Sequence, residues 1–112
     1  MKVSSSNSEH YKWGASCDGW HLVKQQELSV ILEHMPPGAS EVRHYHKQSR
    51  QFFFVLAGIA EMELNGDIHL LEPHEGLEVP PSAPHQVKNV SSESLTFLVI
   101  SHPTTRGDRY EA

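Results

Sequence analysis

The sequence has only one cysteine, Cys17, in 112 residues. A single cysteine cannot form an intrachain disulfide, so nothing in cysteine usage points to an oxidising compartment, and we expect a cytoplasmic protein. The neighbours of Cys17, Ser16 and Asp18, supply no cation that would lower the pKa of the thiol. We therefore interpret Cys17 as a loop cysteine rather than a reactive one.

Long apolar runs and clustered basic residues are also missing. No apolar run approaches the roughly 20 residues that span a bilayer, and the N-terminus MKVSSSNSEHYKW lacks the apolar core of a secretory signal. The formal net charge is -5, and the 9 Lys and Arg are scattered along the chain. We expect neither nucleic acid nor a membrane as a partner, because both favour a clustered basic surface.

The length limits the number of domains. A chain of 112 residues with 38% hydrophobic content is enough for one compact core and too short for two. Residues 1–8, which are rich in serine, are expected to be disordered, and residues 9–112 to form a single domain. Whether the polar tail TTRGDRYEA packs on that domain is left open.

Helical periodicity is absent, and the apolar residues alternate instead. In ELSVILEHM (27–35), Leu28, Val30 and Leu32 recur at every second position, while Ile31 points to the other face. The PPGAS that follows ends this strand. The same pattern predicts strands in EVRHYH, QFFFVLAG, AEMELN, DIHLLE, GLEVPP, HQVKNV and LTFLVIS. Short strands at this spacing are typical of an all-β sandwich or barrel.

One turn is specified by its residue types. Asn65 and Gly66 stand between AEMEL and DIHLL, and a two-residue type I′ turn requires positive φ at both central positions, which Asn and Gly tolerate best. The sequence therefore predicts an antiparallel hairpin here.

Histidine is unusually frequent, with 9 residues, and two of them are paired. His44 and His46 are two residues apart in a predicted strand, so their side chains share a face. Two imidazoles on one face can bind one divalent ion, although a lone His-x-His pair is often only a solvated pair. Most of the other histidines stand alone and are interpreted as solvent-facing or hydrogen-bonded.

The surrounding spacing extends this pattern. Gly38, His44, His46, Gln51 and Gly58 together resemble the first motif of the cupin superfamily, in which the position of Gln51 is usually Glu.

The second cupin motif is present in GLEVPPSAPHQVKN. Gly76, Pro80, His85 and Asn89 match its glycine, proline, histidine and asparagine, and Ser82 stands where the family commonly has glycine. The short separation of the two motifs is similar to that of small single-domain cupins.

The resemblance implies a double-stranded β-helix, or jelly-roll barrel, with a metal ion held by His44, His46, Gln51 and His85. A glutamine carbonyl is a neutral and weaker ligand than a carboxylate. The ion would keep its full charge and act as a stronger Lewis acid. Zn²⁺, Ni²⁺, Co²⁺, Fe²⁺ or Cu²⁺ are then better candidates than Mn²⁺.

Strand parity also predicts the lining of the pocket. Phe53 and Val55 share the face of Gln51, and Val87 shares that of His85, so a small, partly apolar molecule is the expected ligand or substrate.

The opposite face of the aromatic strand carries Phe52 and Phe54. Small cupins commonly dimerise, so the resemblance implies a homodimer that covers these side chains together with Trp13 and Trp20. An ordinary core position is an equally good interpretation of all four aromatic residues.

No catalytic residue is assigned beyond the metal ligands. The titratable groups on or beside the strands are His34, Tyr45, Glu61, Glu63 and His102. Arg43 and Arg50 flank the first motif and are interpreted as solvated rather than as anion-binding.

Three functions remain open. The first is a metal-dependent enzyme, either an oxygenase or an isomerase, cyclase or lyase that uses the ion as a Lewis acid. The second is a non-catalytic module that binds or senses a small ligand. A structural role like that of seed-storage cupins ranks last, because those proteins have two domains and generally lack the metal ligands.

Overall fold

A computed structural model describes residues 1–112, which form strands and no helix. The strands are β1 (Glu9–Trp13), β2 (Cys17–Lys24), β3 (Ser29–Met35), β4 (His44–Tyr45), β5 (Arg50–Ala57), β6 (Ala60–Leu64), β7 (Asp67–Leu71), β8 (Gly76–Val79), β9 (His85–Lys88), β10 (Leu95–His102) and β11 (Tyr110–Glu111).

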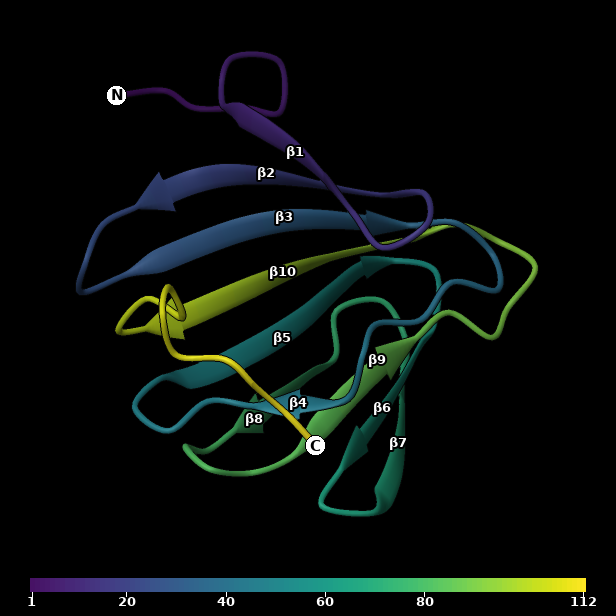
Figure 1. Cartoon of the computed structure of the whole chain (residues 1–112). Coiled ribbons are helices and arrows are strands. Elements are labelled where there is room, and N and C mark those ends of the chain that lie inside the picture. Colours follow the sequence, from purple (N-terminus) through teal and green to yellow (C-terminus); the bar gives the residue numbers. More distant parts are fainter.

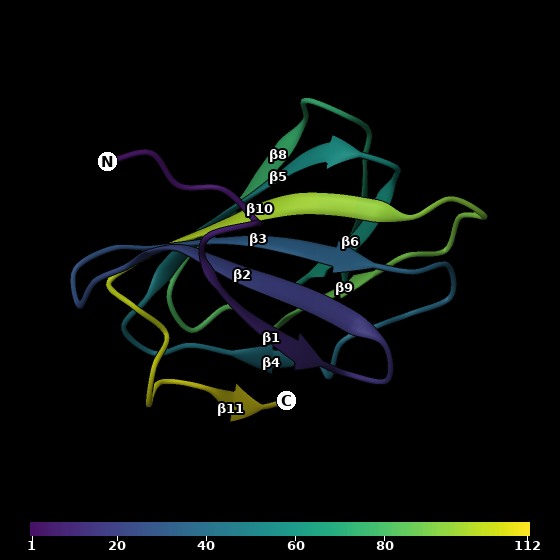
Figure 2. The same cartoon turned by 90° about the horizontal axis from the view of Figure 1, so that it is seen from above.

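The strands form two antiparallel sheets that face each other (Figure 1). The six-stranded sheet has the order β1-β2-β3-β10-β5-β8, and the five-stranded sheet has the order β11-β4-β9-β6-β7. Figure 2 looks down on the six-stranded sheet. Neighbours such as β3 and β10 are far apart in sequence, as in a jelly roll. The expected all-β double-stranded β-helix is confirmed.

The Asn65–Gly66 turn is confirmed as well. Both residues have positive φ, 52° for Asn65 and 91° for Gly66. Leu64 pairs with Asp67 across the turn, which joins β6 and β7. The turn therefore sets the register of this hairpin.

The hydrophobic core lies between the sheets. On β5, Phe53 and Val55 are buried, and they face Met62 and Val87 of the other sheet within one cluster of buried apolar residues. Phe97 of β10 stacks on Phe53 with ring centroids 6.1 Å apart. The parity expected for β5 is thus the observed one, with Phe52 and Phe54 on the outside.

The apolar alternation in β3 suggests that Val30 and Leu32 face the interior, but the opposite face of the strand does. Ser29 and Met35 are buried, and Ile31 and Glu33 line an internal cavity, whereas Leu28 is exposed. Apolar side chains at every second position of β3 therefore form part of the outer face of the sheet.

The N-terminal hairpin β1–β2 was not predicted. Trp13 pairs with Cys17 across its turn, and Gly14 supplies a φ of 59°. The interpretation of Cys17 as a loop residue is wrong: it begins β2 and is 1% exposed. Free cysteine behaves as a small apolar side chain, and burial raises the pKa of this thiol.

The polar tail packs on the domain. Its strand β11 pairs with β4, where Tyr110 lies opposite Tyr45. The two tyrosine rings stack with centroids 5.4 Å apart. The question left open by the sequence is answered: residues from the tail form the edge of the five-stranded sheet.

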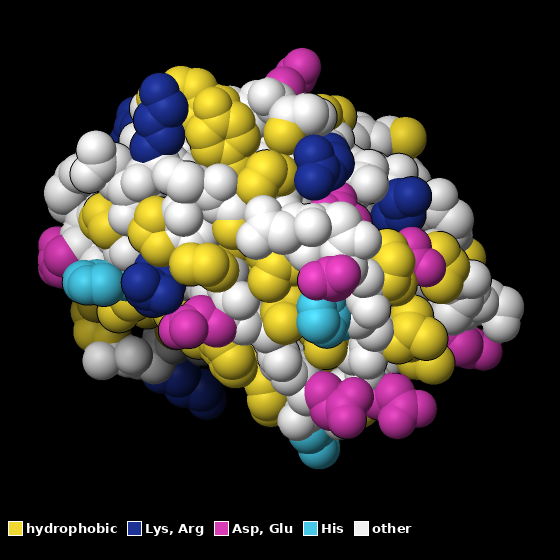
Figure 3. Space-filling model, turned by 90° about the horizontal axis from the view of Figure 1, so that it is seen from below, with side chains coloured by type: hydrophobic (Ala, Val, Ile, Leu, Met, Phe, Trp, Pro, Cys, Tyr) yellow, Lys and Arg dark blue, Asp and Glu magenta, His cyan; other side chains and the backbone are white.

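The structure contains no helix long and apolar enough to cross a bilayer. On the face seen from below, Lys and Arg side chains are spread among acidic and hydrophobic ones (Figure 3). Positive charge is not concentrated on this face.

Candidate metal centre

Three buried imidazoles come together at one end of the space between the sheets. His44 lies on β4, directly paired with His85 of β9, and His46 follows β4. Their side-chain nitrogens lie within 4.8 Å of one another, and the ring centroids of His44 and His85 are 4.5 Å apart. The strand pairing and the two-residue spacing thus bring together the imidazoles of both sequence motifs.

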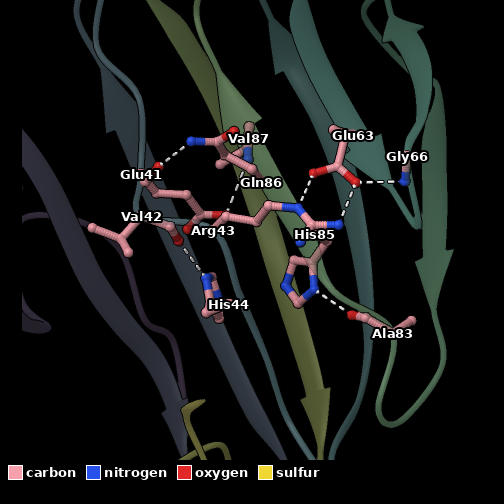
Figure 4. Close-up of polar contacts among 10 residues, drawn as sticks. All are labelled: Glu41, Val42, Arg43, His44, Glu63, Gly66, Ala83, His85, Gln86 and Val87. Atoms are coloured by element: carbon pink, nitrogen blue, oxygen red, sulfur yellow. Dashed lines mark hydrogen bonds and ion pairs between the residues drawn. The ribbon is translucent and has the colours of Figure 1, made fainter. Parts of the chain in front are cut away.

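Each imidazole is held by its Nδ1 atom. His44 Nδ1 donates to the carbonyl of Val42 at 2.7 Å, and His85 Nδ1 donates to that of Ala83 at 2.9 Å (Figure 4). His46 Nδ1 donates to the carbonyl of Asp108. A hydrogen on Nδ1 leaves Nε2 with a free lone pair. The Nε2 atoms of His46 and His85 are buried without a hydrogen-bond partner.

Gln51, on β5 of the opposite sheet, lines a cavity together with His44 and His46. It is 6% exposed, and its Nε2 donates to Ser101 Oγ at 3.1 Å. This bond orients the amide and leaves Oε1 buried without a partner. An unpaired buried carbonyl oxygen is costly, so the arrangement suits a ligand that accepts its lone pair.

The electrostatics keep the imidazoles neutral. Burial lowers the pKa of His44 to about 3, and burial also lowers the pKa values of His46 and His85. The neighbouring His46 and Arg109 add to the effect on His85. Neutral imidazole is the form that binds metal. The donors present therefore fit a divalent transition ion without prior loss of a proton.

Asp108 fixes the loop that carries His46. Its carboxylate accepts hydrogen bonds from the backbone N–H groups of Lys47, Gln48 and Ser49 at 2.8, 2.9 and 3.0 Å. Burial opposes the charge on Asp108, but these hydrogen bonds outweigh it and lower the pKa of the carboxyl. Asp108 thus holds His46 through its carbonyl and the following loop through its side chain.

Ser82, which stands where the second cupin motif commonly has glycine, takes a backbone conformation that favours glycine. Its φ is 70°, in the left-handed region that favours glycine, and its N–H donates to the carbonyl of His46 at 2.6 Å. The second motif thus contacts the first through the backbone.

A cavity of about 150 Å³ opens beside the imidazoles. It is lined by Tyr11, Ile31, Glu33, Glu41, His44, His46, Gln51, Phe53, Val99, Ser101, Thr105 and Arg109. Of the expected pocket residues, Phe53 lines this cavity, whereas Val55 and Val87 lie in the hydrophobic core.

A second cavity, of about 410 Å³, adjoins the first. The two share Tyr11, Ile31 and Thr105, and the larger one also contains Lys24 and Arg106.

The titratable groups singled out in the sequence lie away from this cavity. Glu63 forms an ion pair with Arg43 at 2.6 Å (Figure 4), and Tyr45 stacks on Tyr110. Arg50 lies 3.7 Å from Glu78, which agrees with its interpretation as a surface group. His34, Glu61 and His102 are also absent from the lining.

The sequence interpretation missed Tyr11, Glu33, Glu41 and Arg109, which bring charge and proton-transferring groups into the cavity. A local sequence signal exists only for Glu33. It shares a strand face with Ser29 and Ile31 in β3, so a prediction that this face is the inner one would have placed Glu33 in the interior. Asp108 was missed because its contacts with the first motif span about 60 residues of sequence.

This architecture, two facing antiparallel sheets with a histidine cluster at one end, is that of a jelly-roll barrel. The family model "Cupin domain" matches residues 31–101, and the chain belongs to the cupin family. It is 27% identical over 81 residues to an uncharacterised protein of Methanocaldococcus jannaschii, covering 72% of this chain and 62% of that protein.

Two further relatives are informative. The chain is 36% identical over 69 residues to "Polyketide synthase CurC" of Streptomyces cyaneus, covering 62% of this chain and 45% of that protein. The chain thus spans less than two thirds of these curated relatives. A predicted oxalate decarboxylase from Thermotoga maritima superposes with a TM-score of 0.85 at 18% identity, over 93% of this chain and 100% of the other. That similarity shows the fold.

Proposed function

We propose that this protein is a metal-dependent cupin enzyme that binds one divalent transition ion through His44, His46, Gln51 and His85. The observation that carries the proposal is the set of buried lone pairs without partners, on Nε2 of His46 and His85 and on Oε1 of Gln51. Their opposite ends are fixed by hydrogen bonds. Nitrogen and oxygen atoms that are held in place and have free lone pairs are expected at a metal site.

The neutral donors favour Lewis-acid chemistry. When bound, the ion would polarise a substrate oxygen, and without a carboxylate ligand it would retain its full charge. The same donor set favours Zn²⁺, Ni²⁺, Co²⁺, Fe²⁺ or Cu²⁺ over Mn²⁺. We infer an isomerase, cyclase or lyase reaction ahead of an oxygenase.

The cavity supports a small, partly apolar substrate. Ile31, Phe53 and Val99 supply apolar walls, while Arg109 supplies a positive charge. The similarity to Polyketide synthase CurC supports a substrate that carries carbonyl groups, because carbonyl oxygens are good ligands for a Lewis-acidic ion.

We also infer that a second copy covers the outer face of the six-stranded sheet. Trp20, Leu32, Leu98 and Phe54 form one row across four strands, and Phe52 beside them is 39% exposed. Such a continuous apolar face is typical of an interface. Trp13 does not belong to it, because it packs against the core.

The test of the metal site is elemental analysis of protein purified without added metal, together with titration of the metal-free chain with Zn²⁺ and Co²⁺. We expect one ion per chain, lost in His44→Ala and His85→Ala. His69→Ala, outside the cluster, is the control and should keep the ion. A wild-type chain that binds no ion in either measurement would contradict the proposal.

A second measurement addresses the reaction class. Oxygen uptake by the metal-loaded protein with carbonyl substrates separates an oxygenase from an isomerase, cyclase or lyase.

A further inference from the structure

Gln51 leaves the proposed metal site without a carboxylate ligand, but the cavity beside it contains two carboxyl groups. Glu33 and Glu41 line the same 150 Å³ space as His44, His46 and Gln51. Neither is one of the residues that match the two cupin motifs, although Glu41 lies between Gly38 and His44 of the first motif. The two come from different parts of the chain, and each is positioned by contacts of its own.

Glu33 reaches the cavity in a row that crosses three strands. Tyr11 pairs with Gly19, and Gly19 pairs with Glu33. A Cβ at Gly19 would lie 2.3 Å from Cζ of Tyr11, so the phenol ring lies directly over the glycine. The missing side chain thus allows the hydroxyl of Tyr11 to interact with the Glu33 carboxyl.

Glu41 is fixed from the opposite sheet. Its carboxylate accepts the backbone N–H of Val87 at 3.0 Å (Figure 4), and its own N–H donates to the carbonyl of Val87 at 3.1 Å. The Glu41 carbonyl accepts a bond from Gln86 Nε2 at 2.8 Å. Glu41 is therefore held at both backbone and side chain.

The environment suits proton transfer. Burial raises the pKa of Glu33 to about 8, and the charge of Glu41 adds to this while Arg109 opposes it. Burial likewise raises the pKa of Glu41 to about 8. Two neighbouring carboxyls resist double ionisation, so the pair keeps at least one proton near neutral pH.

A bound dication would lower both of these pKa values. The other groups that face the pair are Tyr11, His44, His46 and Arg109. A carboxyl that titrates near the working pH is the most effective general acid or base.

We propose that Glu33 and Glu41 are the catalytic acid and base of the site, and that they enolise a small carbonyl compound bound beside the imidazoles. The inference rests on the proposed metal-dependent function and specifies its reaction class as proton transfer at the carbon next to a carbonyl.

The step balances without an oxidant. One carboxylate takes the proton from the carbon, and the electrons of the broken C–H bond form the C=C bond of the enol. The carbonyl π electrons move to the oxygen, which receives the proton of the other carboxylic acid. The pair ends with its proton on the opposite member, and the reverse step restores it.

The probe is pyruvate, which has an acidic methyl group next to its carbonyl and a carboxylate that Arg109 can attract. Exchange of the methyl hydrogens for deuterium is followed by proton NMR in D₂O with the Zn²⁺- or Co²⁺-loaded protein. We expect exchange well above that of the free ion, reduced about a hundredfold in Glu33→Gln and Glu41→Gln. Glu61→Gln, a glutamate outside the cavity, is the matched control and should exchange at the wild-type rate.

A second readout uses the metal-free chain. We expect an infrared carbonyl band of protonated carboxylic acid at pH 7, which disappears above about pH 9 and is reduced in Glu33→Gln and Glu41→Gln but not in Glu61→Gln. Absence of this band in the wild-type protein would show that the pair holds no proton at pH 7 and would overturn the acid–base pair.

Metal content separates failure of this proposal from failure of the proposed function. A wild-type chain that holds its ion but exchanges pyruvate no faster than the free ion overturns the catalytic pair alone, as do glutamine variants with wild-type exchange rates. A wild-type chain that binds no ion overturns the metal site itself.

Discussion

The backbone carbonyl of Asp108 accepts the Nδ1 hydrogen of His46 from a position 62 residues further along the chain. The carboxylate of the same residue caps the loop at Lys47, Gln48 and Ser49. One residue near β11 thus orients a proposed metal ligand and the loop behind it.

Asp108→Ala should weaken metal binding without unfolding the domain. Loss of the carboxylate releases three backbone N–H groups, so the Asp108 carbonyl and His46 lose their fixed positions. Groups that orient ligands typically contribute about 10–100-fold to metal affinity. Competition titration with a chelator measures this loss, and Asp67→Ala at the exposed start of β7 is the control. Equal affinities in both variants would show that Asp108 does not orient His46.

Gln51→Glu should change which metal is bound. The carboxylate adds a hard, negatively charged ligand and cancels one unit of charge on the ion, so the preference for Mn²⁺ over Zn²⁺ should rise and the Lewis acidity should fall. Competitive titration with the two ions measures the preference. Gln26→Glu, in the lining of the second cavity of about 410 Å³, is the charge-matched control. An unchanged preference would mean that Gln51 does not bind the ion.

The stability of the metal-free protein should fall as the pH rises from 6.5 to 8. The folded pKa of Glu33 is raised to about 8 from an ordinary value of 4.5, so the folded state holds a proton that the unfolded state has released. This contribution to stability is complete below pH 4.5 and is lost as pH rises through 8. The histidines with lowered pKa values affect the stability only below about pH 6.5. There the unfolded state takes up protons that the folded state does not, so the folded state is destabilised.

Glu33→Gln should therefore reduce, but not abolish, the pH dependence between 6.5 and 8, because the glutamine does not titrate whereas Glu41, whose pKa is also raised to about 8, still does. Thermal unfolding at a series of pH values measures the effect, with Glu61→Gln as the control. A slope in Glu33→Gln that equals the wild-type slope would show that Glu33 does not contribute to the pH dependence.

Gly19→Ala should destabilise the protein by about 1–3 kcal/mol, the usual range for overpacking. The new methyl group would lie 2.3 Å from Cζ of Tyr11 and would displace the ring. In the background Tyr11→Ala the same substitution should cost much less, which a double-mutant cycle in urea detects as coupling. Additive effects would argue against the close contact between Tyr11 and Gly19.

Phe52→Asp should separate the inferred dimer into monomers. A charge placed on the outer apolar face would be desolvated in the interface, whereas Ile68→Asp on β7 alters a side chain that is 57% exposed and lies on the other sheet. Sedimentation velocity distinguishes the two. A wild-type protein that sediments as a monomer at micromolar concentration would contradict the dimer.

The sequence predicts those parts of the site that depend on local spacing. The shared face of His44 and His46 follows from strand geometry, and the resemblance to the cupin motifs adds Gln51 and His85. The hairpin at Asn65 is likewise local, because its turn type is fixed by two residues.

The groups that line the rest of the cavity follow from long-range contacts. Glu33 was hidden because β3 has apolar side chains on its outer face, which reverses the usual relation between apolar alternation and burial. Glu41 owes its position to Val87, 46 residues away, and no local pattern encodes that contact. Tyr11 depends on the missing side chain of Gly19 one strand away.

The four proposed ligands also differ in which sheet they come from. His44 and His85 belong to strands of the five-stranded sheet, whereas Gln51 belongs to the six-stranded sheet. An ion held by all of them would act as a cross-link between the two layers. Ion binding would then suppress separation of the sheets, and slower hydrogen exchange on β5 as well as β9 would record that mechanical coupling.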